Sequence, residues 1–354
     1  MSKAGVSYKI VAVFAAAVIV TAAVVSAAFY YLYLPTVAPP PRPPAKILRF
    51  VFAPDIVGQY MLDSGIYAKY EEKYNIKLVT SATWDDFAFF MGGHADVGSF
   101  GLIEMAHLER ETGKKIVMFG KYNKAYMQLL VKSDSPYQTL ADLKGKRIGI
   151  NSWGGGDVAT FQVLAKKMHG LDFKEGGDFE FVIADYFLLP GLLDKGDIDC
   201  ALCAPTQGAS ILMMEGKIRA MYDGKSQWEV YKDFTGHDGP TYNMWAAYKD
   251  WLDENEDCAK FLLEAWQEGV DAWFEKRAEI MHIYPQLSGA SEGTEEELDF
   301  ILKWENEHEF FYRDIRITPD WAKGEQDFMR FAQEAGAFPP GGEPPEVRYI
   351  TWEE

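Results

Sequence analysis

Two cysteines three residues apart are the most direct candidates for chemistry. Cys200 and Cys203 have the C-x-x-C spacing of redox proteins, in which the first thiol begins a helix that lowers its pKa. Here both lie in 198–203, an apolar run that predicts a buried strand, and alternation would place the two side chains on opposite faces of it. We therefore interpret them as small buried hydrophobic residues. The third cysteine, Cys258, stands alone on a predicted helix face.

The six histidines show no metal-binding pattern. They form no H-E-x-x-H motif and no pair at i,i+4, and none has a cysteine nearby at the spacing of zinc ligands. No G-x-S-x-G or Walker sequence occurs either. The sequence predicts no catalytic residue, no metal site and no cofactor.

A glycine-rich turn is the best candidate for binding a small molecule. Residues 147–151 predict a buried strand, residues 157–169 have the apolar period of a helix, and Ser152-Trp153-Gly154-Gly155-Gly156 stand between them. Such a turn directs backbone N–H groups and the positive end of the helix dipole at the space above it. It is either a small-molecule cradle or an ordinary strand-to-helix connection.

Alternating strands and helices surround this turn. The order over 47–119 is βαβαβαβ, which predicts a mainly parallel, doubly wound α/β sheet. An apolar strand at 125–132 follows, a second α/β unit occupies 147–222, and a returning strand is expected at 241–248. Helices are expected over 258–274, 295–308 and 319–335. The fold class is therefore two doubly wound α/β lobes joined by crossing strands.

In a doubly wound lobe, ligands bind beyond the carboxyl ends of the strands. That geometry selects the loops after the predicted strands, together with positions on the two crossing strands. The candidate ligand contacts are Pro54, Asp55, Ser99, Phe100, Gly101, Tyr126, Gln128, Ser152, Trp153, Gly154, Gly155, Asp185, Tyr186, Pro205, Thr206 and Asn243. The hydroxyls would donate hydrogen bonds, and the aromatic rings would form flat walls, unless they belong to the core.

Acidic residues in these loops bear on the charge of the ligand. Asp55, Asp157 and Asp185 stand in loops without lysine or arginine. This disfavours a bare multivalent anion and suggests a ligand with an amino or cationic group. For Asp157 the favoured interpretation is a helix cap, with ligand contact as the alternative.

The N-terminal segment predicts a membrane anchor. Residues 10–34 are almost entirely apolar and would span ~37 Å as a helix, more than the ~30 Å of a bilayer core. Lys3 and Lys9 precede the segment, which keeps the N-terminus cytoplasmic and exports the rest. A cleaved signal peptide is the alternative, with residues 26–28 as its cleavage site. The predicted organisation is an anchor or signal segment at 1–34, a proline-rich spacer at 35–45, lobe I from 46–125 and 223–338, lobe II at 126–222, and an irregular tail at 339–354.

Composition excludes nucleic acid as a partner. The 354 residues are 48% hydrophobic and carry a net charge of −18. Lys3, Lys9 and Arg42 are the only charged residues among the first 45, so the remainder carries −21. A domain this acidic, without a basic stripe, is unsuited to a polyanion.

Three motifs, in order, resemble a known family. They are Gly92-Gly93-His94-Ala95-Asp96-Val97-Gly98, the stretch Thr139-Leu140-Ala141-Asp142-Leu143-Lys144-Gly145-Lys146-Arg147-Ile148-Gly149, and Leu193-Asp194-Lys195-Gly196-Asp197-Ile198-Asp199. Over about 47–302 the chain resembles substrate-binding proteins of ABC importers, in the nitrate/sulfonate/taurine-binding group that includes thiamine-pyrimidine binders. The motifs themselves are interpreted as structural, with glycines ending helices.

The resemblance implies a type II periplasmic-binding fold and a monomeric receptor on the outer face of the cytoplasmic membrane. It would capture a small polar organic solute, such as a sulfonate, a taurine-like compound or a pyrimidine, and deliver it to permease subunits. A sensor or surface-interaction protein that reuses the fold is the alternative. A pyrimidine synthase with this fold is disfavoured, because the lysine, histidine and cysteine-rich stretch that such enzymes use have no counterpart around 98–104 or 241–247.

Overall fold

The computed structural model describes residues 20–22, 24–25, 43–338, 345–348 and 350. The chain divides into Met1–Ala45 and Lys46–Glu354, and every element named below belongs to the second part. Most of the predicted anchor, the spacer at 35–42 and most of the predicted tail lie outside the described residues. Across the residues that are described, no helix combines the length and the apolar character needed to cross a membrane.

The first of two sheets holds the strands that the sequence predicts for lobe I, and also β11, which lies in the tail that was predicted to be irregular. Within the described residues it has six strands in the order β11-β4-β10-β3-β1-β2. β1 pairs in parallel with β2 and β3, whereas β10 runs antiparallel to β3 and β4. Its strands are β1 (Lys46–Phe52), β2 (Ile76–Ala82), β3 (Val97–Phe100), β4 (Ile116–Lys124), β10 (Thr241–Tyr248) and β11 (Glu346–Val347).

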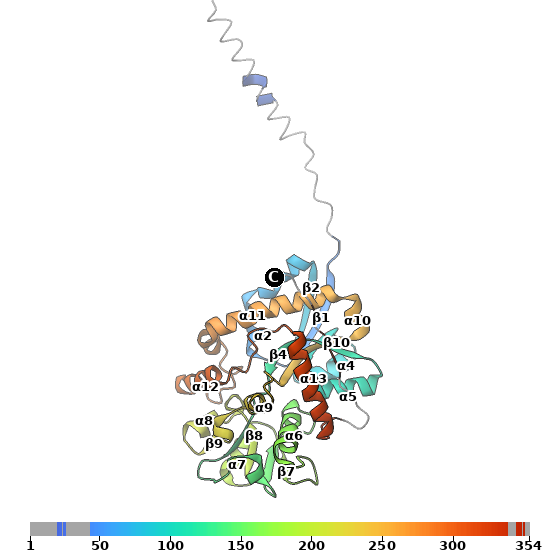
Figure 1. Ribbon diagram of the computed structural model, residues 1–354. Coiled ribbons are helices and arrows are strands. Elements are labelled where there is room, and N and C mark those ends of the chain that lie inside the picture. Colours follow the sequence, from blue (N-terminus) through green and yellow to red (C-terminus); the bar gives the residue numbers. More distant parts are fainter. Residues whose placement is uncertain (1–19, 23, 26–42, 339–344, 349, 351–354) are drawn as a thin grey trace, which may run out of the picture. The chain divides into compact units, whose positions relative to one another are not determined.

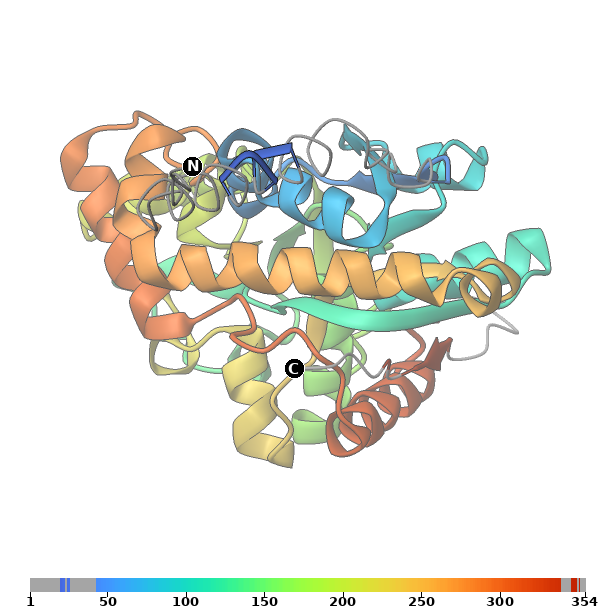
Figure 2. The ribbon, with the colours of Figure 1, turned by 90° about the horizontal axis from the view of Figure 1, so that it is seen from above.

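Both faces of this sheet are buried, which explains the nearly continuous apolar sequence of β10. Along that strand Met244 and Ala246 join one hydrophobic cluster, while Trp245 and Ala247 join the other. The helices α2 (Ile56–Ser64), α3 (Ile66–Tyr74) and α11 (Glu256–Ile283) pack together on the second of these faces, and Figure 2 shows α11 running alongside the two shorter helices. α4 (Asp86–Met91) and α5 (Leu102–Thr112) follow β2 and β3.

The second sheet lies below the first in the view of Figure 1. Within the described residues its five strands have the order β7-β6-β8-β5-β9. The strands are β5 (Gln128–Lys132), β6 (Arg147–Ile150), β7 (Glu180–Ile183), β8 (Cys200–Cys203) and β9 (Ile218–Ala220). Its helices are α6 (Gly156–His169), α7 (Leu189–Lys195) and α8 (Ser210–Met214), with short 3-10 turns η1 (Leu140–Leu143), η2 (Pro205–Gln207) and η3 (Tyr222–Gly224).

Two details differ from the sequence prediction. The strand expected at 125–132 begins only at Gln128, and the preceding strand β4 runs on to Lys124, where the Lys124 N–H bonds the Phe310 carbonyl at 2.6 Å. The sheets are also mixed, because β5 and β10 run antiparallel to their neighbours. β5 is the first strand after the chain passes to the second sheet, and β10 is the first strand after it returns. The strands predicted to cross between the lobes are therefore the ones that break the parallel pattern.

Helices from the C-terminal region contact the second sheet's helices. These elements are α9 (Gln227–Thr235), α12 (Glu295–His308) and α13 (Pro319–Glu334), whereas α10 (Lys249–Glu254) packs against β4, β10 and α11. α12 contacts α8, and α9 and α13 contact α6. Regions assigned by sequence to lobe I and lobe II therefore touch along several helices as well as at the crossing strands.

The prediction for the cysteines is confirmed. Cys200 and Cys203 begin and end β8, and both are fully buried. Cys200 belongs to a different hydrophobic cluster from Cys203, as expected for opposite faces of the strand. Burial raises the pKa of the Cys203 thiol to about 12, so the thiolate needed for redox chemistry is disfavoured.

The repeated glycine–aspartate motif forms the same clamp in both sheets. In the first, Asp96 accepts hydrogen bonds from the Arg49 backbone N–H and guanidinium, and Arg49 also reaches the Gly93 carbonyl. In the second, Asp199 accepts from the backbone N–H and Nε of Arg147, and this arginine also reaches the carbonyl of Gly196. The motif is therefore structural in each sheet, as the sequence predicts.

We expect Asp199→Asn to lower the free energy of unfolding by about 1–3 kcal/mol, because it removes the charge that holds Arg147 against the strand ends. Urea unfolding would measure the loss. The matched control is Asp197→Asn, an exposed position two residues earlier, which should change stability by less than about 0.5 kcal/mol. Equal effects at the two positions would contradict the structural role.

Candidate functional site

The glycine turn after β6 leads into α6 as predicted, but its aspartate does not cap the helix. Gly155 is the N-cap, in extended conformation, and makes no side-chain hydrogen bond. Ser152 and Gly154 are exposed, and Trp153 is half-buried with its ring edge-on to Phe181 at 4.6 Å. The turn therefore offers one aromatic side chain and exposed backbone.

Asp157 is completely buried in the first turn of α6. Its Oδ2 accepts a hydrogen bond of 2.9 Å from the Tyr186 hydroxyl, and its backbone carbonyl accepts one of 2.5 Å from the Gln227 amide. Its other oxygen, Oδ1, has no hydrogen-bond partner. Burial raises the pKa of Asp157 to about 6, an effect that the Tyr186 hydroxyl partly offsets. The cap interpretation from sequence is replaced by a buried carboxyl group with one unpaired oxygen.

Tyr242 of β10 brings the starts of two helices together. Its hydroxyl is 3.4 Å from that of Tyr186, and its ring is edge-on to Tyr126 at 5.6 Å. A Cβ on Gly101, the N-cap of α5, would be 3.3 Å from the Tyr242 carbonyl oxygen, and one on Gly156 would be 3.7 Å from it. Helices that follow strands of both sheets therefore begin against this one residue. We call Tyr126, Tyr186, Tyr242 and the two helix starts the tyrosine junction.

Two more carboxyl groups lie around the start of α5. Glu104 accepts a 2.7 Å hydrogen bond from the Gly101 N–H. Burial raises the pKa of Glu104 to about 7, and the charges of Asp86 and Asp157 add to the rise. Burial likewise raises the pKa of Asp86 to about 6. Among the described residues none of these three carboxyl groups forms an ion pair with lysine, arginine or histidine.

The sequence-selected positions fall into three groups. Gly101, Tyr126, Gly155 and Tyr186 meet at the tyrosine junction, and η2 is tied to it because Gln207 donates a 3.2 Å hydrogen bond to the Tyr126 hydroxyl. The rest of η2 comprises Pro205, which is buried, and Thr206, whose hydroxyl is buried without a partner. A second group lies in loops beside the junction: Trp153 contacts Phe181, and Asp185 accepts a hydrogen bond from the Phe187 N–H. Its other members are Ser152 and Gly154, and all but Trp153 are exposed.

The third group is already engaged in the fold. Asp55 caps α2 and accepts a 2.8 Å hydrogen bond from the Tyr122 hydroxyl, directly after Pro54. Burial raises the pKa of Asp55 to about 6. Ser99 is buried within β3, and the Asn243 backbone N–H bonds the side chain of Asn123.

Phe100 and Gln128 are buried in the core. Phe100 ends β3 and packs against Phe90 at 5.0 Å. Gln128 is 1% exposed, and both ends of its amide are bonded, to the Gly224 carbonyl and the Trp304 indole. Both pack within the core of this structure, and their contact with a ligand stays a prediction.

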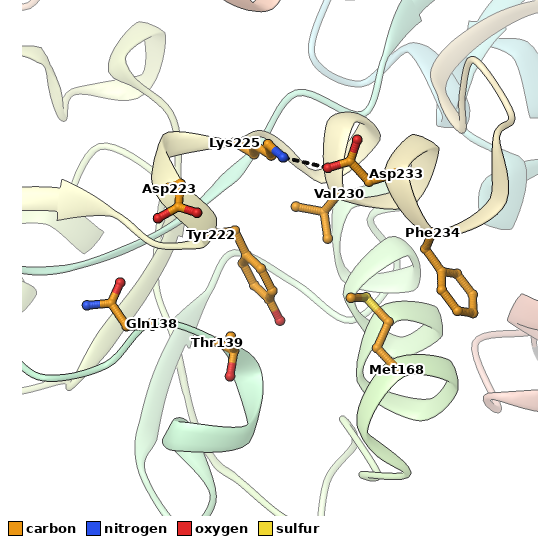
Figure 3. Close-up of a pocket in the computed structure, with 9 residues that line it drawn as sticks. All are labelled: Gln138, Thr139, Met168, Tyr222, Asp223, Lys225, Val230, Asp233 and Phe234. Carbon is orange, nitrogen blue, oxygen red and sulfur yellow. Dashed lines mark hydrogen bonds and ion pairs between the residues drawn. The ribbon is translucent and has the colours of Figure 1, made fainter.

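Two surface hollows in the described part of the chain lie away from the junction. One, of about 290 Å³, lies beside η3 and the start of α9, where Lys225 pairs with Asp233 (Figure 3). The other, of about 670 Å³, lies between α9 and α13. Neither includes a residue of the tyrosine junction. We favour the junction as the ligand site over these hollows. The contact between Tyr186 and Tyr242 closes the junction, and a closed site shows no open cavity.

Sequence reasoning missed Tyr242, Glu104, Gln207 and Gln227. Tyr242 precedes Asn243 on the returning strand, and alternation alone could have placed one of the two toward the cleft. Glu104 follows the Ser99–Gly101 turn by one helical turn, the position of a capping glutamate. The glutamines carry no sequence signal, since their position depends on helices distant along the chain.

Comparisons with known proteins agree with this architecture. A family model described as NMT1/THI5 like matches residues 75–280. The structure of the periplasmic aliphatic sulphonate-binding protein SsuA from Escherichia coli is similar at a TM-score of 0.63, with 17% identity over 83% of this chain and 94% of that one. The alkanesulfonate-binding protein SsuA from Xanthomonas axonopodis pv. citri bound to MOPS is similar at 0.62, with 15% identity over 84% and 96%.

At these identities the structural matches show a shared mixed α/β fold, that of periplasmic binding proteins. A sulfonate-binding protein SsuA from Methylobacillus flagellatus gives a TM-score of 0.62 at 17% identity, over 86% of this chain and 92% of its own. No curated protein matches this chain by sequence.

Proposed function

This chain belongs to the NMT1/THI5-like family, and from that premise we propose that it is an extracytoplasmic receptor that captures a small polar organic solute and delivers it to an ABC importer. Sulfonates, taurine-like compounds and pyrimidines span the range of solutes considered. In this proposal the protein binds and releases its solute unchanged and is not an enzyme.

The meeting of two helix starts at Tyr242 is the observation that carries the proposal. α5 follows β3 of the first sheet and α6 follows β6 of the second, so each begins where ligands bind in α/β folds. Gly101 and Gly156 approach the Tyr242 carbonyl closely enough that a side chain on Gly101 would be crowded. A solute held there would contact elements of both sheets, and its binding would favour the closed arrangement of the two lobes.

A solute held between the two sheets also defines where the lobes begin and end. We propose lobe I as 46–125 with 223–338, and lobe II as 126–222. The chain passes from the first sheet to the second between Lys124 and Gln128 and returns between Ala220 and Thr241. Opening would rotate the lobes about these two passages, separating the hydroxyls of Tyr186 and Tyr242.

Thermal unfolding of the full-length chain with a solute panel tests the proposal. We expect at least one member among sulfonates, amino acids, pyrimidines and oxyanions to raise the melting temperature by several degrees, since saturation at one hundred times Kd stabilises a protein by about 2.7 kcal/mol. If no member of the panel shifts the transition, the receptor function is contradicted. A sensor protein would also bind a solute, so binding alone does not separate it from a transport receptor. Genes for a permease and an ATPase next to the gene for this protein would favour the transport receptor.

Trp153→Ala is expected to remove part of the solute-induced stabilisation, because its turn leads into α6 at the junction, while lowering the stability of the unliganded protein by only about 1 kcal/mol. The ring is half-buried, and the substitution removes its edge-on contact with Phe181 at the margin of the core. Thermal melts with and without the best solute would measure both effects. Trp84→Ala, at a tryptophan that is 78% exposed outside the turn, should change neither. A large loss of stability without solute would place Trp153 in the core instead.

The N-terminal segment is proposed to hold this receptor on the outer face of the cytoplasmic membrane. Its apolar residues 10–34 are long enough to span a bilayer, and Lys3 and Lys9 orient it. Mass spectrometry of the N-terminus of the membrane-bound protein would distinguish an intact anchor from a cleaved signal peptide, which would begin the mature chain near residue 28.

A further inference from the structure

Buried polar atoms without partners gather around the tyrosine junction. Among the described residues eight buried side-chain nitrogen or oxygen atoms lack a hydrogen bond, and four of them are Asp157 Oδ1, Thr206 Oγ1, Gln207 Oε1 and Gln227 Oε1. Hydrogen bonds and one ring contact join three of their residues in one series, Gln207–Tyr126–Tyr242–Tyr186–Asp157–Gln227. Unpaired groups are costly in a protein interior, so their concentration in one place calls for a partner.

Two of these atoms identify the partner's chemistry, because both can only accept. Asp157 Oδ1 belongs to a carboxyl group whose other oxygen already accepts from Tyr186. The Gln227 amide has a fixed orientation: its Nε2 donates to the Asp157 carbonyl, which has no proton to offer, so Oε1 is the unpaired end. Asp157 and Gln227 are 0% and 1% exposed. Both therefore lack a hydrogen-bond donor.

The charge of the surroundings is negative. Asp86 and Asp157 both act electrostatically on Glu104, and no cationic side chain among the described residues pairs with any of the three. The N–H group at the start of α5, which could otherwise hold an anion, already donates to Glu104. No group of three or more His, Cys, Asp or Glu among the described residues is arranged to hold a metal ion. The missing positive charge is therefore that of an organic group.

We propose that the solute carries a cationic nitrogen with N–H donors, as in a primary ammonium, an amidinium or a guanidinium group, and that Asp157 Oδ1 and Gln227 Oε1 accept hydrogen bonds from it beside the tyrosine rings. This rests on the receptor function proposed above and narrows its solute class. The rings of Tyr126, Tyr186 and Tyr242 suit such a group, because the faces of aromatic rings attract cations. Access requires Tyr186 and Tyr242 to separate as the lobes open.

Matched probes that differ only in the head group test this inference. Benzylamine, benzamidine, benzyltrimethylammonium and phenylmethanesulfonate share one ring, and ethanolamine, hydroxyethylguanidine, choline and hydroxyethanesulfonate share one short alcohol. We expect the amine, amidine and guanidine probes to raise the melting temperature of the full-length chain. The trimethylammonium probes keep the charge but have no N–H donor, and should bind at least tenfold more weakly. The sulfonates should not bind.

Two variants locate the effect. Asp157→Asn keeps the shape and an acceptor for Tyr186 but removes the charge, and it should weaken binding of the amine probes by tenfold to a hundredfold in calorimetric titrations. Gln227→Met removes the acceptor Oε1, together with the hydrogen bond that Nε2 donates to the Asp157 carbonyl, and should weaken binding by about tenfold. Asp299→Asn, at an exposed position on α12, is the control and should leave the affinity unchanged. The melting temperature without probe shows whether each variant is folded.

Each result decides a different question. Stabilisation by the sulfonates and not by the amines would overturn the cationic class and leave the receptor function standing. Binding of the amines that is unchanged in both variants would overturn the assignment of Asp157 and Gln227. If none of the eight probes binds, the cationic class is contradicted, and the wider solute panel then decides whether the receptor function falls with it.

Discussion

The unliganded protein is expected to gain stability as the pH falls from 8 to about 5. The pKa values of Asp55, Asp86 and Asp157 rise to about 6, and that of Glu104 to about 7, in each case mainly through burial. The ordinary values are 3.8 for aspartate and 4.5 for glutamate. Between these values the folded state binds more protons than the unfolded state, so acidification favours folding.

The size of the effect can be bounded from Asp157 alone. Its pKa rises by about two units, and each unit is worth about 1.36 kcal/mol, so this fully buried group contributes up to about 3 kcal/mol. That stabilisation is fully present at a pH below the pKa of Asp157 in the unfolded chain. It is lost as the pH rises through the pKa of Asp157 in the folded protein. Urea unfolding at half-unit steps of pH would measure it.

Two variants, and a reversal of the pH dependence at low pH, test whether the buried carboxyl groups cause this effect. Asp157→Asn should reduce the slope of the pH dependence between 5 and 8, since Asp55, Asp86 and Glu104 still contribute, whereas Asp299→Asn should leave it unchanged. Below about pH 4.5 the trend should reverse, because carboxyl groups such as Glu229 have lowered pKa values and lose their native interactions on protonation. Stability that is constant, or that rises, between pH 5 and 8 would contradict the burial of these acids without cationic partners.

Glu297→Ala is expected to cost about 3–5 kcal/mol of unfolding free energy, a large loss for a single substitution. The carboxylate is fully buried at the start of α12. It accepts hydrogen bonds from the Ser210 hydroxyl at 2.5 Å and from the backbone N–H groups of Ser291, Glu292 and Gly293 at 2.7, 2.8 and 2.9 Å. The substitution would leave these donors without their acceptor where α12 meets α8.

The same contacts predict a pH effect of opposite sign from that of the junction. Burial by itself would raise the pKa of Glu297, but the Ser210 hydroxyl and the three N–H groups together lower it below 4.5. Its contribution is therefore present above pH 4.5 and lost as the pH falls through the folded value. Glu296→Ala, at an exposed neighbour in the same helical turn, should cost less than about 1 kcal/mol. Equal losses from the two variants in urea unfolding would show that the four hydrogen bonds contribute little.

Much of the architecture follows from local sequence pattern. β10 occupies the expected 241–248, and the helices at 295–308 and 157–169 are found within one residue of their expected bounds. The glycine–aspartate motifs have the structural role that was predicted for them. These features depend on alternation, helical period and glycine at chain reversals, all of which are properties of neighbouring residues. The predicted ligand contacts themselves stay a prediction.

What the sequence alone determined about this protein is therefore an α/β chain with two sheets, buried cysteines, an acidic body and the loops in which a ligand site would lie. Only the tertiary structure decided which residues share that site. Asp157 meets Tyr186 across 29 positions and Gln227 across 70, and Tyr186 meets Tyr242 across 56. In the sequence Asp157 is indistinguishable from a helix cap. Whether one of its oxygens lacks a hydrogen-bond partner depends on side chains from distant elements. The local sequence around Asp157 does not specify the positions of those side chains.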